Sequence, residues 1–220
     1  MPRMSRLIVP AYPHHVTQRG VRSMDIFPDD DARWAYLQFL SEEAKRFGVQ
    51  FLSWCLMTNH VHFIAIPENL QSLARAFREA HRRYTRMRNF KEGVRGYLFQ
   101  GRFGSCVLDE KHLVAAARYV ERNPVKAGIT SHPRDYQWSS ARFHLGIIET
   151  DVMVVDRTLL GLVSDWEDLL KSENEEDSKR LRLFTRTGRP VGDDNFAEKV
   201  KNLTGKDPRP RPAGRPRKGR

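Results

Sequence analysis

The sequence has few cysteines and no long hydrophobic run. Its only two cysteines, Cys55 and Cys106, form neither a metal-binding spacing nor a disulfide framework, which excludes a zinc finger or a disulfide-rich secreted scaffold. The longest stretch without Asp, Glu, Lys or Arg, residues 47–67, holds several polar residues and two histidines, so it is not a membrane span. No apolar segment of signal-peptide length follows Met1, and we therefore expect a soluble protein of a reducing, intracellular compartment.

Acidic residues are also in deficit. The chain has 38 Lys and Arg against 27 Asp and Glu, a formal net charge of +11 and a pI near 10.0. Such a surplus favours a polyanionic partner, with nucleic acid first and an anionic membrane surface second. Because 40% of the residues are hydrophobic, the 220-residue chain is able to bury a core, and wholesale disorder is excluded.

The order of hydrophobic patterns predicts an α+β fold. Strands are predicted at 15–19, 50–57, 60–66 and, as one or two strands, 97–108; helices are predicted from Asp29 to Phe47, at 70–88, and from Asp109 to a point before Pro124. The first six of these elements form a βαββαβ run. That order predicts a ferredoxin-like, four-stranded antiparallel sheet with its helices on one face. The third helix is an addition to that unit.

The second part of the chain has a different character. We divide the sequence into a main domain at 1–142, a helical extension at 143–205 and a basic tail at 206–220. In the extension, leucines and a tryptophan between residues 159 and 170 predict one helix, an acidic segment follows at 173–177, and a short helix is predicted at 195–203. The tail alternates Pro, Gly and basic residues with nothing apolar to bury, which predicts disorder in isolation.

The most specific local feature is the pair His60 and His62, which lies on the predicted 60–66 strand. Side chains alternate along a strand, so both imidazoles point to one face and lie next to each other. Neutral imidazole is a common ligand of divalent metals. The alternative is two polar residues on the less buried face of the sheet, and the motif by itself does not decide between them.

The helix that follows Asp109 supplies a partner for these histidines. Its apolar stripe holds Leu113, Ala117 and Val120, while Tyr119 and Asn123 are stacked neighbours at the rim of that stripe. A metal site on the sheet would then have a tyrosine hydroxyl nearby and an amide oxygen from Asn123 as a third ligand. The alternative is an interfacial tyrosine beside a helix-terminal asparagine. Tyr84, a rival tyrosine, lies in the apolar stripe of the 70–88 helix, where core packing is the better interpretation.

Basic residues gather on that same 70–88 helix and in the tail. We expect the DNA-binding residues among Arg75, Arg78, Arg82, Arg83, Arg86, Arg102, Arg215, Arg217 and Lys218. The helix arginines lie mostly opposite the apolar stripe, at a density that suits a polyphosphate, although a solvated face is the simpler alternative. Residues 213–218 resemble the Gly-Arg-Pro core of AT-hook segments, which bind the minor groove, and the alternative is a solubilising tail.

Several spaced sequence blocks, in order, resemble those of the single-tyrosine HUH transposases, most closely the REP-associated tyrosine transposases of bacteria. The similarity covers roughly residues 3–142. Its blocks are PHHVTQRG at 13–20, CLMTNHVH at 55–62, FQGRF at 99–103, ARYVERNPVKAG at 117–128 and WSS at 138–140.

The resemblance implies metal-assisted transesterification of single-stranded or hairpin DNA near palindromes. His60 and His62 match the metal-binding histidines, with Mg²⁺ or Mn²⁺ as the ion. Tyr119 matches the nucleophile that forms a 5′-phosphotyrosine, and Asn123 stands at the amide position of the metal shell, where the shorter Asn in place of Gln favours a water-bridged role. The family implies a bacterial cytoplasmic, nucleoid-associated protein. It contains monomers and helix-exchanging homodimers, so the oligomeric state stays open.

Two other functions remain open at this stage. One is a non-catalytic, domesticated protein that binds hairpin DNA or RNA. The other is a metal phosphoesterase that uses water as its nucleophile.

Overall fold

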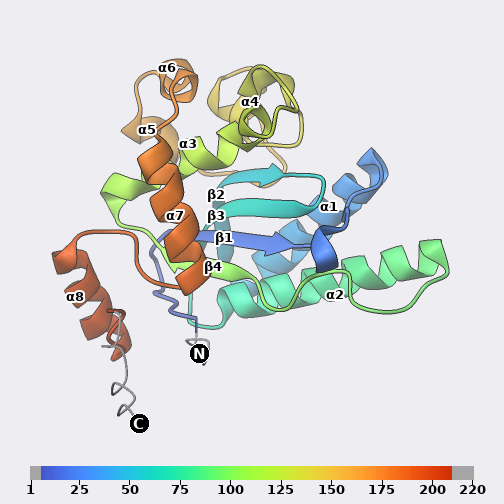
Figure 1. The fold of residues 1–220 in the computed structure, drawn as a ribbon, viewed down its shortest axis with the longest axis horizontal. Coiled ribbons are helices and arrows are strands. Elements are labelled where there is room, and N and C mark those ends of the chain that lie inside the picture. Colours follow the sequence, from blue (N-terminus) through green and yellow to red (C-terminus); the bar gives the residue numbers. More distant parts are fainter. Residues whose placement is uncertain (1–5, 210–220) are drawn as a thin grey trace, which may run out of the picture.

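An antiparallel sheet of four strands forms the centre of the molecule (Figure 1). The computed structural model describes residues 6–209. The strands are β1 (His14–Arg19), β2 (Val49–Leu56), β3 (His60–Pro67) and β4 (Gly104–Val107), in the order β2-β3-β1-β4. This is the predicted ferredoxin-like order. Of the predicted 97–108 strand region, only 104–107 is a strand, and Phe99 forms a single bridge with Gly20.

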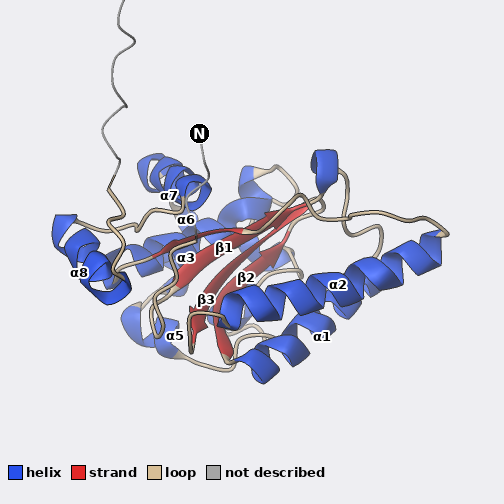
Figure 2. Cartoon of the chain, turned by 90° about the horizontal axis from the view of Figure 1, so that it is seen from below, coloured by secondary structure: helices blue, strands red, loops and turns tan. Residues whose placement is uncertain are grey.

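Two helices, α1 (Asp30–Phe47) and α2 (Ser72–Glu92), cover one face of the sheet, as predicted (Figure 2). The Asp29 carboxylate caps α1 by accepting from Ala32 N at 2.8 Å, and Gly48 ends it at a φ of 64° that favours glycine. Aromatic rings from α2 and the sheet pack together beneath these helices. Tyr84 lies in this core, fully buried, with its hydroxyl donating to Ile26 O at 2.6 Å.

The opposite face is covered by α3 (Glu110–Lys126) and α7 (Glu175–Thr187) (Figure 2). The prediction that α3 ends before Pro124 is wrong, because the helix continues to Lys126. A helical proline removes the N–H that would bond the carbonyl of Val120. The Asn123 amide compensates by donating to Tyr119 O at 2.7 Å and to Val120 O at 3.4 Å. The side chain before the proline therefore gives the Val120 carbonyl a donor in place of the missing proline N–H.

A buried carboxylate fixes α3 against the rest of the structure. Glu121 accepts from Ser140 Oγ at 2.6 Å, from His144 Nδ1 at 2.5 Å and from Trp166 Nε1 at 2.8 Å. Ser53 of β2 adds a bond at 3.2 Å. Glu121 is fully buried, so these donors replace the water that its carboxylate would otherwise bind.

The chain after residue 127 forms short elements that pack onto this framework. They are η2 (Pro133–Asp135), α4 (Ala141–His144), α5 (Thr158–Leu162), α6 (Trp166–Lys171) and α8 (Asp194–Thr204). The prediction of a single helix over 159–170 is wrong. The segment forms two helices, α5 and α6, because Asp165 caps the start of α6 by accepting from Asp168 N. The acidic segment at 173–177 is the start of α7, whose N-cap is Asn174.

Apolar residues of this C-terminal part share one core with the sheet. Met153, Leu159, Trp166 and Leu181 belong to the same buried cluster as the strand residues. The predicted 195–203 helix is α8, and it packs on the segment before β1. No helix among residues 6–209 is long and apolar enough to cross a membrane. Most of the basic tail, with Arg215, Arg217 and Lys218, lies outside the described residues.

Candidate active site

Three histidines meet on the sheet face that α3 and α7 cover. His60 and His62 are adjacent on β3, with ring centroids 4.9 Å apart. On the neighbouring strand β1, Thr17 pairs with His62, and alternation therefore places His15 on the same face. The His15 ring stacks on that of His62 with 5.2 Å between centroids. The predicted pair is confirmed as a pair of neighbours, and a third imidazole joins it.

A chain of hydrogen bonds fixes the proton positions on these rings. Thr185 Oγ1 donates to Leu181 O at 2.7 Å, so it accepts from His15 Nδ1, also at 2.7 Å. His15 Nε2 is then the acceptor in its 2.9 Å bond with His62 Nδ1. His62 consequently carries its proton on Nδ1 and a lone pair on Nε2. His60 follows the same pattern, since its Nδ1 donates to Asn59 Oδ1 at 2.7 Å.

Tyr119 of α3 stands over these rings. Its centroid lies 5.5 Å from that of His62 and 5.9 Å from that of His15, both in edge-to-face geometry. The tyrosine is only 9% exposed, and burial raises the pKa of its phenol above the ordinary value. The positive charges of Arg182 and Lys126 lower that pKa, as does the side chain of Asn123.

The histidines and Tyr119 line an open cleft of about 470 Å³. Its wall includes arginines from three parts of the chain: Arg19, Arg102, Arg182 and Arg186. No Asp or Glu of the described residues lines it. A cleft with guanidinium groups and no carboxylate has a positive potential, and guanidinium forks match the geometry of phosphate oxygens.

The donor set of the cleft suits a divalent ion with open coordination positions. The Nε2 atoms of His60 and His62 have no protein partner in the described part of the chain, and burial lowers the pKa of both imidazoles, that of His60 to about 4. No group of three or more His, Cys, Asp or Glu among residues 6–209 is arranged to hold a metal ion. The fit is therefore to two imidazoles, with water or a substrate oxygen completing the shell. Asn123, the predicted third ligand, does not line the cleft.

The predicted basic residues separate into different surroundings. Arg78, Arg82 and Arg86 of α2, with Arg102, line a groove beside the cleft. Arg75 is exposed outside that groove, and Arg83 instead pairs with Glu42 and Glu43 of α1.

Sequence reasoning gave no role to His15, Arg19, Thr185 or Arg182. Alternation along β1 already places His15 and Arg19 on one face, so that signal was present in the sequence. Thr185 and Arg182 belong to α7, a helix that was not predicted.

Comparison with known proteins bears on the family and the fold of the chain. The family model described as "Transposase IS200 like" matches residues 10–123. A solved structure of a REP-associated tyrosine transposase bound to a REP hairpin shares 18% identity, with a TM-score of 0.56 over 71% of this chain and 92% of that one. A candidate transposase from Deinococcus radiodurans R1 shares 16% identity, with a TM-score of 0.39 over 55% and 96%. No curated protein matches the chain.

Proposed function

The chain belongs to the IS200-like transposase family, whose model spans slightly more than half of its 220 residues, and from this premise we propose a single-tyrosine DNA strand transferase. Its substrate is single-stranded DNA beside a hairpin-forming palindrome. Tyr119 is the nucleophile, His60 and His62 are the metal-binding residues, and Asn123 assists them. The DNA-binding residues are Arg78, Arg82, Arg86 and Arg102, together with the basic tail.

One observation carries this proposal: the Tyr119 ring lies 5.5 Å from the His62 ring inside an arginine-lined cleft. The rival Tyr84 is fully buried on the other side of the sheet with its hydroxyl bonded to a backbone carbonyl, so it has no access to a phosphate. Tyr119 is the tyrosine that shares a cavity with the paired imidazoles.

The chemistry follows from the groups in the cleft. The Tyr119 oxygen attacks phosphorus, a bond forms between them, and the bond from phosphorus to the 3′ oxygen breaks. The phenol proton ends on that oxygen, leaving a free 3′-hydroxyl and a 5′-phosphotyrosine. The reverse attack by a second 3′-hydroxyl rejoins strands without ATP, because the phosphodiester energy is kept in the covalent link. Arg182, Arg19 and their neighbours stabilise the charge on the phosphate oxygens.

A bound Mg²⁺ or Mn²⁺ would supply Lewis-acid polarisation of the scissile phosphate. His60 and His62 would hold it through their Nε2 atoms, whose lone pairs the hydrogen-bond chain leaves available. The Asn123 amide nitrogen donates to backbone carbonyls of its own helix, and Asn123 does not line the cleft, so its oxygen would act on the ion through a bridging water.

The hairpin part of the proposal rests on similarity of fold. The matching structure, at 18% identity, is bound to a REP hairpin. In the present chain, the exposed arginines of α2 form a basic surface next to the cleft. That arrangement suits a duplex stem held near the strand that is cut.

The test is to incubate the protein with hairpin-bearing single-stranded DNA and Mn²⁺ or Mg²⁺, then to look for a protein–DNA adduct that survives denaturant. We expect an adduct from the wild type and from the Tyr84→Phe variant, and none from Tyr119→Phe.

An adduct retained by Tyr119→Phe and lost in Tyr84→Phe would overturn the assignment. Cleavage without an adduct would favour the hydrolytic phosphoesterase. Tight binding without cleavage would favour the domesticated hairpin-binding protein.

A further inference from the structure

Helix α3 carries Tyr119 and the buried carboxylate of Glu121 on opposite sides of one turn. Successive residues of an α-helix are about 100° apart around its axis, so these two side chains flank Val120. Val120 is fully buried in the core that the helix shares with the sheet. Tyr119 extends towards β1 and β3, where its ring meets those of His15 and His62. Glu121 extends the other way, towards β2 at the edge of the sheet.

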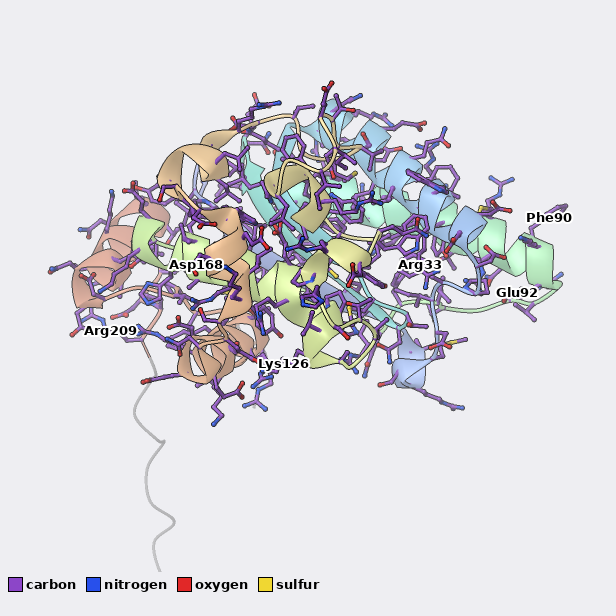
Figure 3. The ribbon with its side chains drawn as sticks, turned by 90° about the horizontal axis from the view of Figure 1, so that it is seen from above. Arg33, Phe90, Glu92, Lys126, Asp168 and Arg209 are labelled. Atoms are coloured by element: carbon purple, nitrogen blue, oxygen red, sulfur yellow. The ribbon has the colours of Figure 1, made fainter. Side chains whose placement is uncertain are left out.

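The donors to Glu121 come from four separate parts of the chain. They are Ser53 of β2, Ser140 before α4, His144 of α4, and Trp166, the first residue of α6. Helix α6, which carries the labelled Asp168 in Figure 3, packs against α3. Ser140 is itself tied to β2, since its Oγ accepts from Trp54 N and its N–H donates to Trp54 O, both at 3.0 Å. The carboxylate therefore binds groups that the sheet and the C-terminal helices hold in place.

This arrangement fixes the rotation of α3 about its own axis. A rotation that lifts the Tyr119 ring from the histidines drives Glu121 towards the sheet, and the opposite rotation withdraws Glu121 from its donors. Either movement leaves a fully buried carboxylate short of hydrogen bonds, which raises the free energy of the folded protein. The position of the phenol is therefore coupled to hydrogen bonds on the far side of the helix.

We propose that Glu121 is a positioning residue, which holds Tyr119 in the cleft through hydrogen bonds on the opposite side of α3. The segment 140–166, which supplies Ser140, His144 and Trp166, thereby takes part in the reaction. The inference rests on the proposed role of Tyr119. Glu121 is fully buried and does not line the cleft, so it acts through the placement of the phenol and not through contact with the substrate.

The test removes one donor to Glu121 without changing any charge. Trp166→Phe deletes the indole N–H that donates to Glu121 at 2.8 Å and keeps an aromatic ring beside His144. The matched control is Tyr84→Phe, which also deletes one buried hydrogen-bond donor from an aromatic ring, on the other face of the sheet. Urea unfolding of both variants establishes that each is folded and how much stability each has lost.

Rates and affinities separate positioning from binding. The rate of adduct formation is measured at saturating hairpin-bearing DNA with Mn²⁺. Fluorescence anisotropy gives the affinity for the DNA, and the EPR signal of the free ion gives the affinity for Mn²⁺. Trp166→Phe is expected to lower the rate at least about tenfold, because small displacements of a reacting group are costly, and to leave both affinities unchanged. Tyr84→Phe is expected to leave all three quantities at their wild-type values.

Two further measurements address position directly. The Tyr119 ring stands edge-to-face on His62 with 5.5 Å between centroids, so its ring current shifts the NMR signals of the His62 ring protons. Those signals should move in Trp166→Phe and stay in place in Tyr84→Phe, with neither DNA nor metal present. Glu121→Asp keeps the charge but shortens the side chain by a methylene. A carboxylate that acts by its position should therefore give a lower rate of adduct formation in this variant as well.

A wild-type rate or unshifted His62 signals in a folded Trp166→Phe protein would overturn the inference, as would an equal loss of rate in Tyr84→Phe. Its failure is distinguishable from that of the proposed function. A wild-type adduct that Trp166→Phe forms equally fast rejects the positioning role alone. Shifted His62 signals in Trp166→Phe, when the wild type forms no adduct, support the positioning of Tyr119 and reject the covalent chemistry.

Discussion

Replacing Thr185 with valine tests whether α7 controls the histidines that we propose as metal ligands. Valine keeps the shape of threonine but cannot accept the proton of His15 Nδ1, a bond of 2.7 Å in a buried site. His15 is then free to carry its proton on Nε2, where it would donate to His62 Nδ1. That reversal moves the His62 proton onto Nε2, the atom proposed to bind the ion.

The structure sets the size of the effect. After that reversal His15 Nδ1 is a buried acceptor without a donor, and a buried polar group left unpaired costs about 1–3 kcal/mol in the free energy of unfolding. Loss of a partner that orients a metal-binding histidine typically costs about 10–100-fold in metal affinity. We therefore expect Thr185→Val to unfold at lower urea concentration and to bind Mn²⁺ at least about tenfold more weakly.

The assay is a Mn²⁺ titration followed by the EPR signal of the free ion, with urea unfolding measured in parallel without metal. Thr187→Val is the matched control, because its hydroxyl donates to Leu183 O in the same helix but contacts nothing in the cleft. Unchanged Mn²⁺ affinity in a Thr185→Val protein that is destabilised as expected would refute the tautomer argument and leave Thr185 a purely structural residue.

Three further predictions concern stability and DNA affinity. Glu121→Leu leaves Ser140, His144 and Trp166 without their acceptor, so urea unfolding should show a loss on the order of 3 kcal/mol or more, and a loss below about 1 kcal/mol would contradict the network. Burial lowers the pKa of His14 to about 4 in the folded protein. As the pH falls below 6.5, His14 is therefore protonated in the unfolded chain before it is protonated in the folded protein, and the folded protein loses stability. Between pH 6.5 and 5 the loss from this residue is about 2 kcal/mol in the free energy of unfolding. In His14→Gln, urea unfolding should therefore show a smaller difference in stability between pH 6.5 and pH 5 than in the wild type. A difference equal to that of the wild type would contradict this prediction. Deleting residues 208–220 should weaken DNA binding about equally on all sequences and make the DNA affinity less dependent on salt concentration. An unchanged salt dependence would show that the tail does not contribute to DNA binding.

The strands, α1 and α2 were predictable because their apolar residues follow simple periods. The same alternation placed His60 and His62 on one face, and the structure confirms that they are neighbours. Periodicity also assigned Tyr84 to the core. It did not state which face of the sheet α3 covers, and the approach of Tyr119 to the histidines depends on that choice.

The missed features have physical reasons. Helix α7 has few apolar residues, and its buried side includes the polar Ser178 and Thr185, so its hydrophobic stripe is too short to detect. The rule that proline ends a helix failed at Pro124, where the Asn123 side chain donates to the Val120 carbonyl that lacks a proline N–H. Both cases depend on side-chain hydrogen bonds, which residue patterns do not show.

The contact between His15 and Thr185 joins residues 170 positions apart in the chain. During synthesis, the paired histidines and Tyr119 leave the ribosome well before α7 does. A nascent or prematurely terminated chain therefore contains Tyr119 and the paired histidines without the Thr185 hydroxyl that bonds His15. The order of translation therefore delays completion of the histidine cluster until α7 has been made.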